Sequence, residues 1–178
     1  MSFLTLDEIQ NLITAVPNFP KEGIIFRDIT PLLAHPKGIS SVVELFYQLI
    51  KQQGIQVDVI AAMESRGFLF GVPLAERLDV GFVPIRKPGK LPRAVYSESY
   101  SLEYGEDVLE IHQDGIKAGS KVLLVDDLLA TGGTALASAK LVKQTGGELQ
   151  AILFLMALVG LPGGQKLSDH QHFALLKY

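Results

Sequence analysis

The 178-residue chain contains no cysteine. Disulfides, thiolate metal sites and cysteine nucleophiles are therefore excluded. Long hydrophobic runs are also missing, since the longest, from Ala151 to Val159, has nine residues, whereas a membrane-spanning helix needs roughly 18–20. The start of the chain carries Asp7 and Glu8 and lacks the basic segment and following apolar stretch of a secretory or transit signal. We expect no transmembrane segment, no membrane partner and a cytoplasmic location.

Positive charge is not in excess either. The chain has 16 Lys and Arg residues against 19 Asp and Glu, which gives a net charge of −3, so general binding to nucleic acid is not expected. Hydrophobic residues make up 48% and charged residues 20%, which is typical of a globular protein with a substantial core. The length fits one compact domain over residues 1–178.

The N-terminal part has helical patterns around an irregular segment. Thr5 and Glu8 have the spacing of a capping box, and apolar residues recur at helical intervals from Leu6 to Val16. Proline and glycine then interrupt the pattern, which predicts an irregular segment over residues 24–33. A second amphipathic helix is predicted over residues 39–50.

Strands and helices alternate in the rest of the chain. Apolar strands are predicted at residues 57–63, 80–85 and 121–125, and helices at 68–78 and 134–145. This alternation predicts an α/β fold with a mainly parallel twisted sheet flanked by helices. Right-handed crossovers bring the strand-to-helix loops to one edge of such a sheet, where ligands bind.

One segment breaks this alternation. Residues 96–102 and 107–112 flank the sequence Glu-Tyr-Gly-Glu at 103–106. They are predicted to form a long β-hairpin that projects from the domain, with Glu103 and Tyr104 at its tip.

The strongest local signal lies in residues 122–134. A buried strand is predicted to end in Asp126 and Asp127, and the small, hydroxyl-rich turn Ala-Thr-Gly-Gly-Thr at 130–134 then leads into a helix. The amides and hydroxyls of this turn, with the positive end of the helix dipole, can hold a phosphate. The adjacent carboxylates can accept hydrogen bonds from the vicinal hydroxyls of a ribose. A lone Asp or Gly pair would more simply start a helix or form a turn, but the ordered combination indicates a function.

Other nucleotide sites fit the sequence less well. The turn lacks the lysine of a P-loop, and no G-x-G-x-x-G occurs anywhere in the chain. ATPase and dinucleotide-binding functions are therefore disfavoured.

Two further loops follow predicted strands. The loop at 86–93 holds two arginines, two lysines and no acidic residue, as a pyrophosphate site requires. Taken alone, this short run is equally consistent with a solvated loop. Residues 64–67, Glu-Ser-Arg-Gly, bring a hydroxyl, a guanidinium group and helix-start amides that can bind phosphate oxygens together.

These segments resemble a known family. Residues 122–134 resemble the phosphoribosyl pyrophosphate-binding signature of type I phosphoribosyltransferases. Further agreement with the adenine phosphoribosyltransferase family lies in residues 19–20, 23–31, 64–71, 86–92 and 99–105, so the similarity extends from about Phe19 to the end of the sequence. The resemblance implies an N-terminal hood over about residues 1–34 and a hairpin lid over about residues 93–114.

The same resemblance implies an activity. In that family the enzyme transfers the 5-phosphoribosyl group from phosphoribosyl pyrophosphate to adenine, which gives AMP and pyrophosphate in purine salvage. The implied metal is Mg²⁺, held mainly by oxygens of the substrate, because no preformed all-protein metal cage is evident in the sequence. The implied partners are adenine, phosphoribosyl pyrophosphate, AMP, pyrophosphate and a second copy of the chain in a homodimer.

The resemblance also assigns residues to parts of the site. It places the 5′-phosphate and ribose on Asp126, Asp127, Ala130, Thr131, Gly132, Gly133 and Thr134. It places pyrophosphate on Glu64, Ser65, Arg66, Arg86, Lys87 and Lys90, and adenine beside Ile25, Phe26, Arg27 and Leu129. It gives catalytic roles to Glu103, Arg66 and Lys90, with Glu103 near purine N7, and assigns Tyr104 to the lid. A strained peptide, which can be cis, is implied between Glu64 and Ser65.

Two alternatives stay open. A related transferase for a 6-oxopurine or orotate would share most of these residues, but the early position of the segment 24–27 is a trait of the adenine enzymes. A 6-oxo group would also require a donor where adenine requires an acceptor. A regulatory module that binds the phosphoribosyl group without catalysis could lose Arg66, Lys90 or the Glu103 lid, and this chain retains all three.

Overall fold

The computed structural model describes residues 2–101 and 106–178. Its helices are α1 (Leu6–Asn11), α2 (Thr30–Ala34), α3 (Gly38–Gln53), α4 (Arg66–Leu78), α5 (Gly133–Gln144) and α6 (Gly163–Lys166). Its strands are β1 (Thr14–Pro17), β2 (Ile25–Asp28), β3 (Val59–Met63), β4 (Gly81–Ile85), β5 (Val95–Ser101), β6 (Glu106–His112), β7 (Lys121–Leu129), β8 (Glu148–Ala157) and β9 (His172–Lys177).

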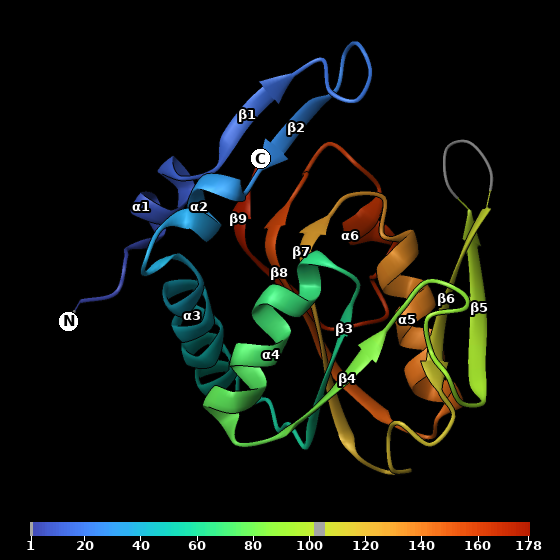
Figure 1. Cartoon of the computed structure of the whole chain (residues 1–178). Helices are drawn as coiled ribbons and strands as arrows, with labels where there is room; N and C mark the ends of the chain where they lie inside the picture. Colours follow the sequence, from blue (N-terminus) through green and yellow to red (C-terminus); the bar gives the residue numbers. More distant parts are fainter. Residues whose placement is uncertain (1, 102–105) are drawn as a thin grey trace.

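The central sheet has five strands in the order β4-β3-β7-β8-β9, and every neighbouring pair is parallel. Helices α3 and α4 pack on one face, and α5 packs on the other (Figure 1). The predicted α/β fold with a mainly parallel sheet is therefore confirmed. Because the strands point the same way, the loops after β3, β4 and β7 meet at one edge.

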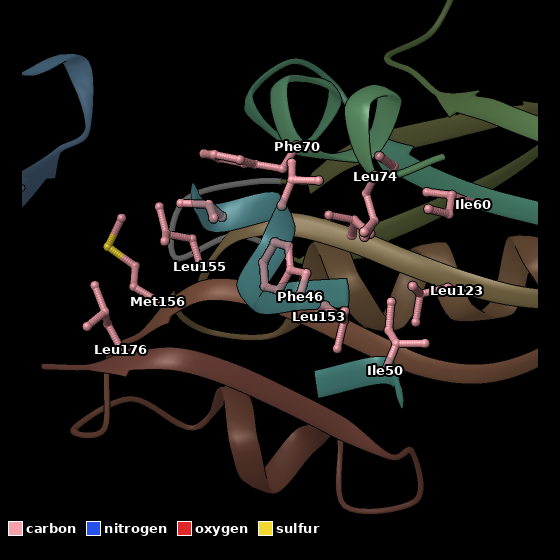
Figure 2. Packing of buried hydrophobic residues seen from close by; sticks show 14 of the residues in the cluster. Phe46, Ile50, Ile60, Phe70, Leu74, Leu123, Leu153, Leu155, Met156 and Leu176 are labelled. Carbon is pink, nitrogen blue, oxygen red and sulfur yellow. The ribbon is translucent and has the colours of Figure 1, made fainter. Parts of the chain in front are cut away.

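Large apolar side chains fix α3 and α4 on the sheet. Phe46 of α3 and Phe70 and Leu74 of α4 are fully buried, and Figure 2 shows them packed over Leu123 and Leu153 of the sheet. Each fully buried side chain of this size contributes about 1.5–3 kcal/mol to the free energy of unfolding. This packing holds the N-terminal end of α4 at the edge where the loops meet.

The N-terminal region differs from its sequence pattern. The capping box of Thr5 and Glu8 is confirmed, but α1 ends at Asn11 instead of reaching Val16. Residues 14–17 instead form β1, which pairs antiparallel with β2 in the register Val16 with Phe26. The segment expected to be irregular thus contains β2 and α2. Pairing between distant residues satisfies backbone groups that the local helical periodicity cannot reveal.

Strand β7 is longer than predicted. The expected strand over residues 121–125 continues to Leu129, because β8 keeps pairing with it as far as Ala157. Asp126 and Asp127 therefore lie within the strand, and the prediction that the strand ends at this doublet is wrong.

The predicted hairpin is formed by β5 and β6, with Tyr100 opposite Asp107. Backbone hydrogen bonds join Glu110 to Arg86 just beyond β4, and Lys140 of α5 forms an ion pair with Glu98 of β5 at 2.7 Å. The hairpin thus lies along α5, as Figure 1 shows. Glu103 and Tyr104, the predicted catalytic and lid residues at its tip, lie outside the described residues.

Within the described part of the chain, no helix is both long and apolar enough to cross a membrane.

Candidate active site

A cavity of about 400 Å³ opens at the edge where the loops meet. Its wall combines the β3–α4 connection, the end of β7 with the following turn, and residues of the β5–β6 hairpin toward the end where β5 stops and β6 begins. The lining residues are Glu64, Ser65, Arg66, Lys87, Tyr100, Asp107, Leu109, Asp126, Asp127, Leu128, Leu129, Ala130, Thr131, Gly132, Thr134 and Ala135.

The turn at 130–134 forms one end of this cavity. Gly132 has a φ of 77°, a conformation that side chains other than glycine rarely adopt. A Cβ at this position would also lie 3.0 Å from Cα of Gly163 in α6. The tight turn delivers the chain directly into α5, whose first backbone amides are available for an anion. The geometry is that of a small phosphate cradle.

The acidic doublet lies beside this turn. Asp127 is 3% exposed, and its Oδ2 lies 3.0 Å from Nε of Arg66 at the start of α4. Oδ1 of Asp126 accepts a hydrogen bond from the backbone N of Asp127 at 2.9 Å. Asp126 and Asp127 line the cavity together with the turn, so a sugar bound there would lie beside both carboxylates.

Burial controls the ionisation of the doublet. It raises the pKa of Asp126 well above its ordinary value, and the charge of Asp127 acts in the same direction. Burial also raises the pKa of Asp127, although the guanidinium group of Arg66 opposes this effect. Hydrogen-bond donors such as sugar hydroxyls would stabilise the charged carboxylates and offset the cost of their burial.

Glu64 organises the basic loop after β4. It accepts hydrogen bonds from the backbone N of Lys87 at 2.8 Å and from Nε of Arg86 at 3.2 Å, and it also pairs with Nζ of Lys90. Burial raises the pKa of Glu64, but the hydrogen bonds from Lys90 and the Lys87 backbone outweigh burial, so the pKa is lowered. The loop is therefore tied to the site, although Arg93 at its far end pairs with exposed Asp114.

The peptide bond between Glu64 and Ser65 is cis. The family resemblance implied a strained peptide here that can be cis, and the structure agrees with it.

The end of β5 and the start of β6 contribute groups that the sequence patterns did not reveal. Oδ2 of Asp107 lies 2.9 Å from Nζ of Lys87 and accepts a hydrogen bond from the Tyr100 hydroxyl at 3.2 Å. The hydrogen bond with Asp107 raises the pKa of Lys87, and the same hydrogen bond lowers the pKa of Asp107. The cross-strand pairing of Tyr100 with Asp107 was the available signal, but only the fold shows that it faces the cavity.

A second cavity, of about 450 Å³, lies under the β1–β2 pair. Its lining includes Phe26 of β2 and Phe19, whose rings meet edge to face at 5.3 Å. Arg66 lines both cavities, and its guanidinium carbon lies 5.6 Å from the centre of the Phe26 ring. Arg66 thus connects the apolar cavity with the acidic doublet.

The structure brings most of the proposed site residues together. Those that line the first cavity are Glu64, Ser65, Arg66, Lys87, Asp126, Asp127, Leu129, Ala130, Thr131, Gly132 and Thr134. Arg86 and Lys90 connect to it through Glu64, and Gly133 begins α5 behind the turn. Phe26 lines the second cavity, whereas Ile25 is half exposed and the Arg27 side chain turns away to the ring of Tyr178.

Among the described residues, no group of three or more His, Asp or Glu side chains is placed to hold a metal ion.

Comparisons with known proteins agree with this geometry. Residues 28–174 match the family model of the phosphoribosyl transferase domain. The chain is 55% identical over 175 residues to the adenine phosphoribosyltransferase of Francisella tularensis subsp. tularensis, with 98% of this chain and 100% of the relative covered.

Solved structures agree as well. Adenine phosphoribosyltransferase from Thermoanaerobacter pseudethanolicus superimposes with a TM-score of 0.94 at 52% identity, covering 98% of this chain and 100% of that one. The Saccharomyces cerevisiae enzyme, solved with an imino-altritol bisphosphate and adenine, gives a TM-score of 0.92 at 42% identity and covers 96% of this chain and 98% of its own. The chain therefore belongs to the phosphoribosyl transferase domain family and, within it, to the adenine phosphoribosyltransferases.

Proposed function

We propose that this chain transfers the 5-phosphoribosyl group of phosphoribosyl pyrophosphate to adenine, which gives AMP and pyrophosphate in purine salvage. The observation that carries this proposal is the meeting, in one cavity, of the phosphate turn, the acidic doublet and the loop held by Glu64. The 55% identity to an adenine phosphoribosyltransferase over nearly the whole chain favours adenine over a 6-oxopurine or orotate.

The donor substrate would occupy the first cavity from end to end. The turn from Ala130 to Thr134 holds the 5′-phosphate, and Asp126 and Asp127 accept hydrogen bonds from the ribose hydroxyls. Pyrophosphate lies toward Ser65, Arg66, Arg86, Lys87 and Lys90, whose positive charges and amides offset its negative charge.

Adenine would bind on the side of β2. Phe26 and Leu129 pack on its faces, and backbone groups around Ile25 and Arg27 donate to a ring nitrogen and accept from the exocyclic amine. The apolar cavity under β1 and β2 supports this placement, because Phe26 lines it beside Arg66.

Catalysis then depends mainly on alignment and charge. Pyrophosphate leaves while N9 attacks the anomeric carbon from the opposite face, which inverts that centre through an oxocarbenium-like state. Closure of the hairpin lid would exclude water. Glu103 is proposed to take a proton from, or hydrogen-bond to, the purine near N7, and Tyr104 to close over the site with it.

Magnesium is proposed as the metal. The doublet supplies adjacent carboxylate oxygens, and a cation that keeps most of its ligands from phosphate, ribose and water needs no further protein cage. When bound, the ion would neutralise charge on the pyrophosphate. The residues present thus fit a metal held mainly through the substrate.

Three further proposals follow from the family. The first is a single domain over residues 1–178, with a hood at about 1–34 and a lid at about 93–114. A homodimer is supported by the exposed apolar side chains of Phe3, Leu69 and Val72, which are 52%, 37% and 49% exposed, and analytical ultracentrifugation tests it. Cell fractionation tests the expected cytoplasmic location.

Steady-state turnover with adenine, hypoxanthine and guanine in parallel tests the proposed reaction. AMP formation from adenine alone is the expected result. Turnover with hypoxanthine or guanine in its place would identify a transferase for another base. No turnover with any base, together with retained binding of phosphoribosyl pyrophosphate, would identify a regulatory binding module.

A further inference from the structure

The two faces of β2 make different contacts. Successive side chains of a strand point to opposite faces, and Phe26 faces Arg66 and the apolar cavity. Arg27 faces the other way, with its guanidinium carbon 4.1 Å from the centre of the Tyr178 ring. The β2 backbone, which is the proposed base-recognition element, therefore lies between a cavity and a stacked arginine.

Tyr178 is itself firmly placed. It follows β9 directly, its backbone N donates to the carbonyl of Ala157 at 2.9 Å, and its carbonyl accepts from the backbone N of Val159 at 2.8 Å. Its side chain packs against the buried cluster under α3 and α4, and in Figure 1 the label C lies next to β2. Tyr178 is thus held by the backbone of the central sheet, and its ring forms a contact between that sheet and Arg27 of β2.

The stacked pair leaves two polar atoms without hydrogen bonds. Within the described chain, Nε of Arg27 and the hydroxyl of Tyr178 are buried and have no hydrogen-bond partner. A guanidinium group over an aromatic face gains an electrostatic attraction that grows as water is excluded. The ring therefore gives the Arg27 guanidinium a favourable electrostatic contact, while the Tyr178 hydroxyl makes no hydrogen bond with the described residues.

We propose that Tyr178 is a positioning residue for the purine site: its ring fixes Arg27, and through it the β2 backbone that would bind adenine. This inference rests on the proposed function, since it concerns the base side of the same site. Because Tyr178 lies outside the cavity that would hold phosphoribosyl pyrophosphate, it should affect the use of one substrate and spare the other.

Kinetics of Tyr178→Leu and Tyr178→Phe with each substrate varied in turn test the inference. We expect Tyr178→Leu to raise the KM for adenine about fivefold to tenfold, the size of a partly desolvated cation–π contact, with little change in the KM for phosphoribosyl pyrophosphate. Tyr178→Phe keeps the ring and should restore the wild-type KM for adenine.

The chain offers a matched control. Arg77 stacks over the ring of Tyr47 at 3.7 Å, between α4 and α3 and away from both cavities. Tyr47→Leu removes the same kind of contact and should leave both KM values unchanged. Thermal unfolding of each variant reports any general loss of stability.

A double-mutant cycle shows whether Tyr178 acts through Arg27. In an Arg27→Leu background, Tyr178→Leu should cause almost no further rise in the KM for adenine. Additive effects, an equal rise in both KM values, or an unchanged KM for adenine in Tyr178→Leu would each overturn the inference. If the wild-type protein forms no AMP from adenine, the proposed function itself fails, and the two failures are thereby distinguished.

Discussion

The phosphate side of the candidate site stands on β7, a central strand paired with β3 on one side and β8 on the other, whereas the base side stands on β2, which pairs only with β1 within the described chain. Residues 122–125 of β7 are fully buried, while Ile25 of β2 is 53% exposed. The groups proposed to bind the donor substrate thus stand on a strand that is paired on both sides, and those proposed to bind the base stand on a separate pair of strands. Substitutions on the two sides should accordingly affect different substrates.

Asp127→Asn is expected to cause the largest difference between the kinetic effects on the two substrates. The amide keeps the size of the side chain but loses the charge that faces Arg66 and the ribose site. We expect kcat/KM for phosphoribosyl pyrophosphate to fall roughly 100-fold, as for loss of charge-assisted hydrogen bonds, with little change in the affinity for adenine.

Asp114→Asn is the control for this change, because Asp114 is exposed and pairs with Arg93 away from the cavity. Steady-state kinetics with each substrate varied measure both variants. Wild-type kinetics in Asp127→Asn would remove the doublet from the phosphate side.

Gly132→Ala should have the next largest effect. The new Cβ would meet the Gly163 backbone at 3.0 Å in a conformation that already disfavours alanine, so the phosphate turn must shift. We expect kcat/KM for phosphoribosyl pyrophosphate to fall about 10-fold to 30-fold.

Gly54→Ala is the control for Gly132→Ala, because it introduces the same backbone strain without displacing the turn at 130–134. Gly54 also has a positive φ, of 64°, but nothing lies within 4 Å of its hypothetical Cβ. Gly54→Ala should lose about 1 kcal/mol of unfolding free energy and Gly132→Ala more, because of the added contact with Gly163; urea titration measures both. Equal kinetics in the two variants would contradict the assignment of the turn.

Phe26→Leu tests the base side with a smaller expected change. Leucine keeps apolar volume but loses the aromatic face that lies beside Arg66. We expect the KM for adenine to rise about threefold to fivefold, and the KM for phosphoribosyl pyrophosphate to stay near its wild-type value. Tyr47→Leu, which removes an aromatic ring beside Arg77 away from both cavities, should change neither. An effect of Phe26→Leu on both substrates would show that the two sides are not independent.

The smallest expected effect concerns stability. Burial first, and the charge of Asp127 second, raise the pKa of Asp126 above its ordinary value of 3.8. The folded protein therefore binds this proton more tightly than the unfolded chain, so the charged carboxylate lowers the free energy of unfolding at neutral pH. Asp126→Asn should raise the Tm by about 2–6 °C at neutral pH while weakening use of phosphoribosyl pyrophosphate.

The pH dependence of this difference gives an internal check. As the pH falls toward 3.8, wild-type Asp126 becomes protonated and its cost disappears. The Tm difference between the two proteins should therefore shrink on acidification, as differential scanning calorimetry would measure. A difference that grows on acidification would contradict a raised pKa.

The phosphate side was largely predictable from the sequence because its determinants are local. The run from Asp126 to Thr134 is contiguous, and the pattern of alternating strands and helices already indicated that its loop meets the others at one edge. The strand end was predicted wrongly, since pairing with β8 extends β7 to Leu129, and pairing partners distant in the sequence leave no mark on local periodicity.

The base side was much less predictable for the same reason. The pairing of Val16 with Phe26 overrides the helical periodicity that predicted a longer first helix. Tyr100 and Asp107 were missed because an ordinary cross-strand pair does not show which cavity it faces.

By itself, the sequence determined the α/β class, the small turn at 130–134, the acidic doublet and the basic loop, because each depends on the order of neighbouring residues. Only the tertiary structure decided that Glu64 accepts hydrogen bonds from the basic loop, that Arg66 lines both cavities, and that Tyr178 lies against Arg27. Residues 27 and 178 are brought together by the packing of β2 beside the end of β9, and a contact across such a distance depends on the whole chain between them.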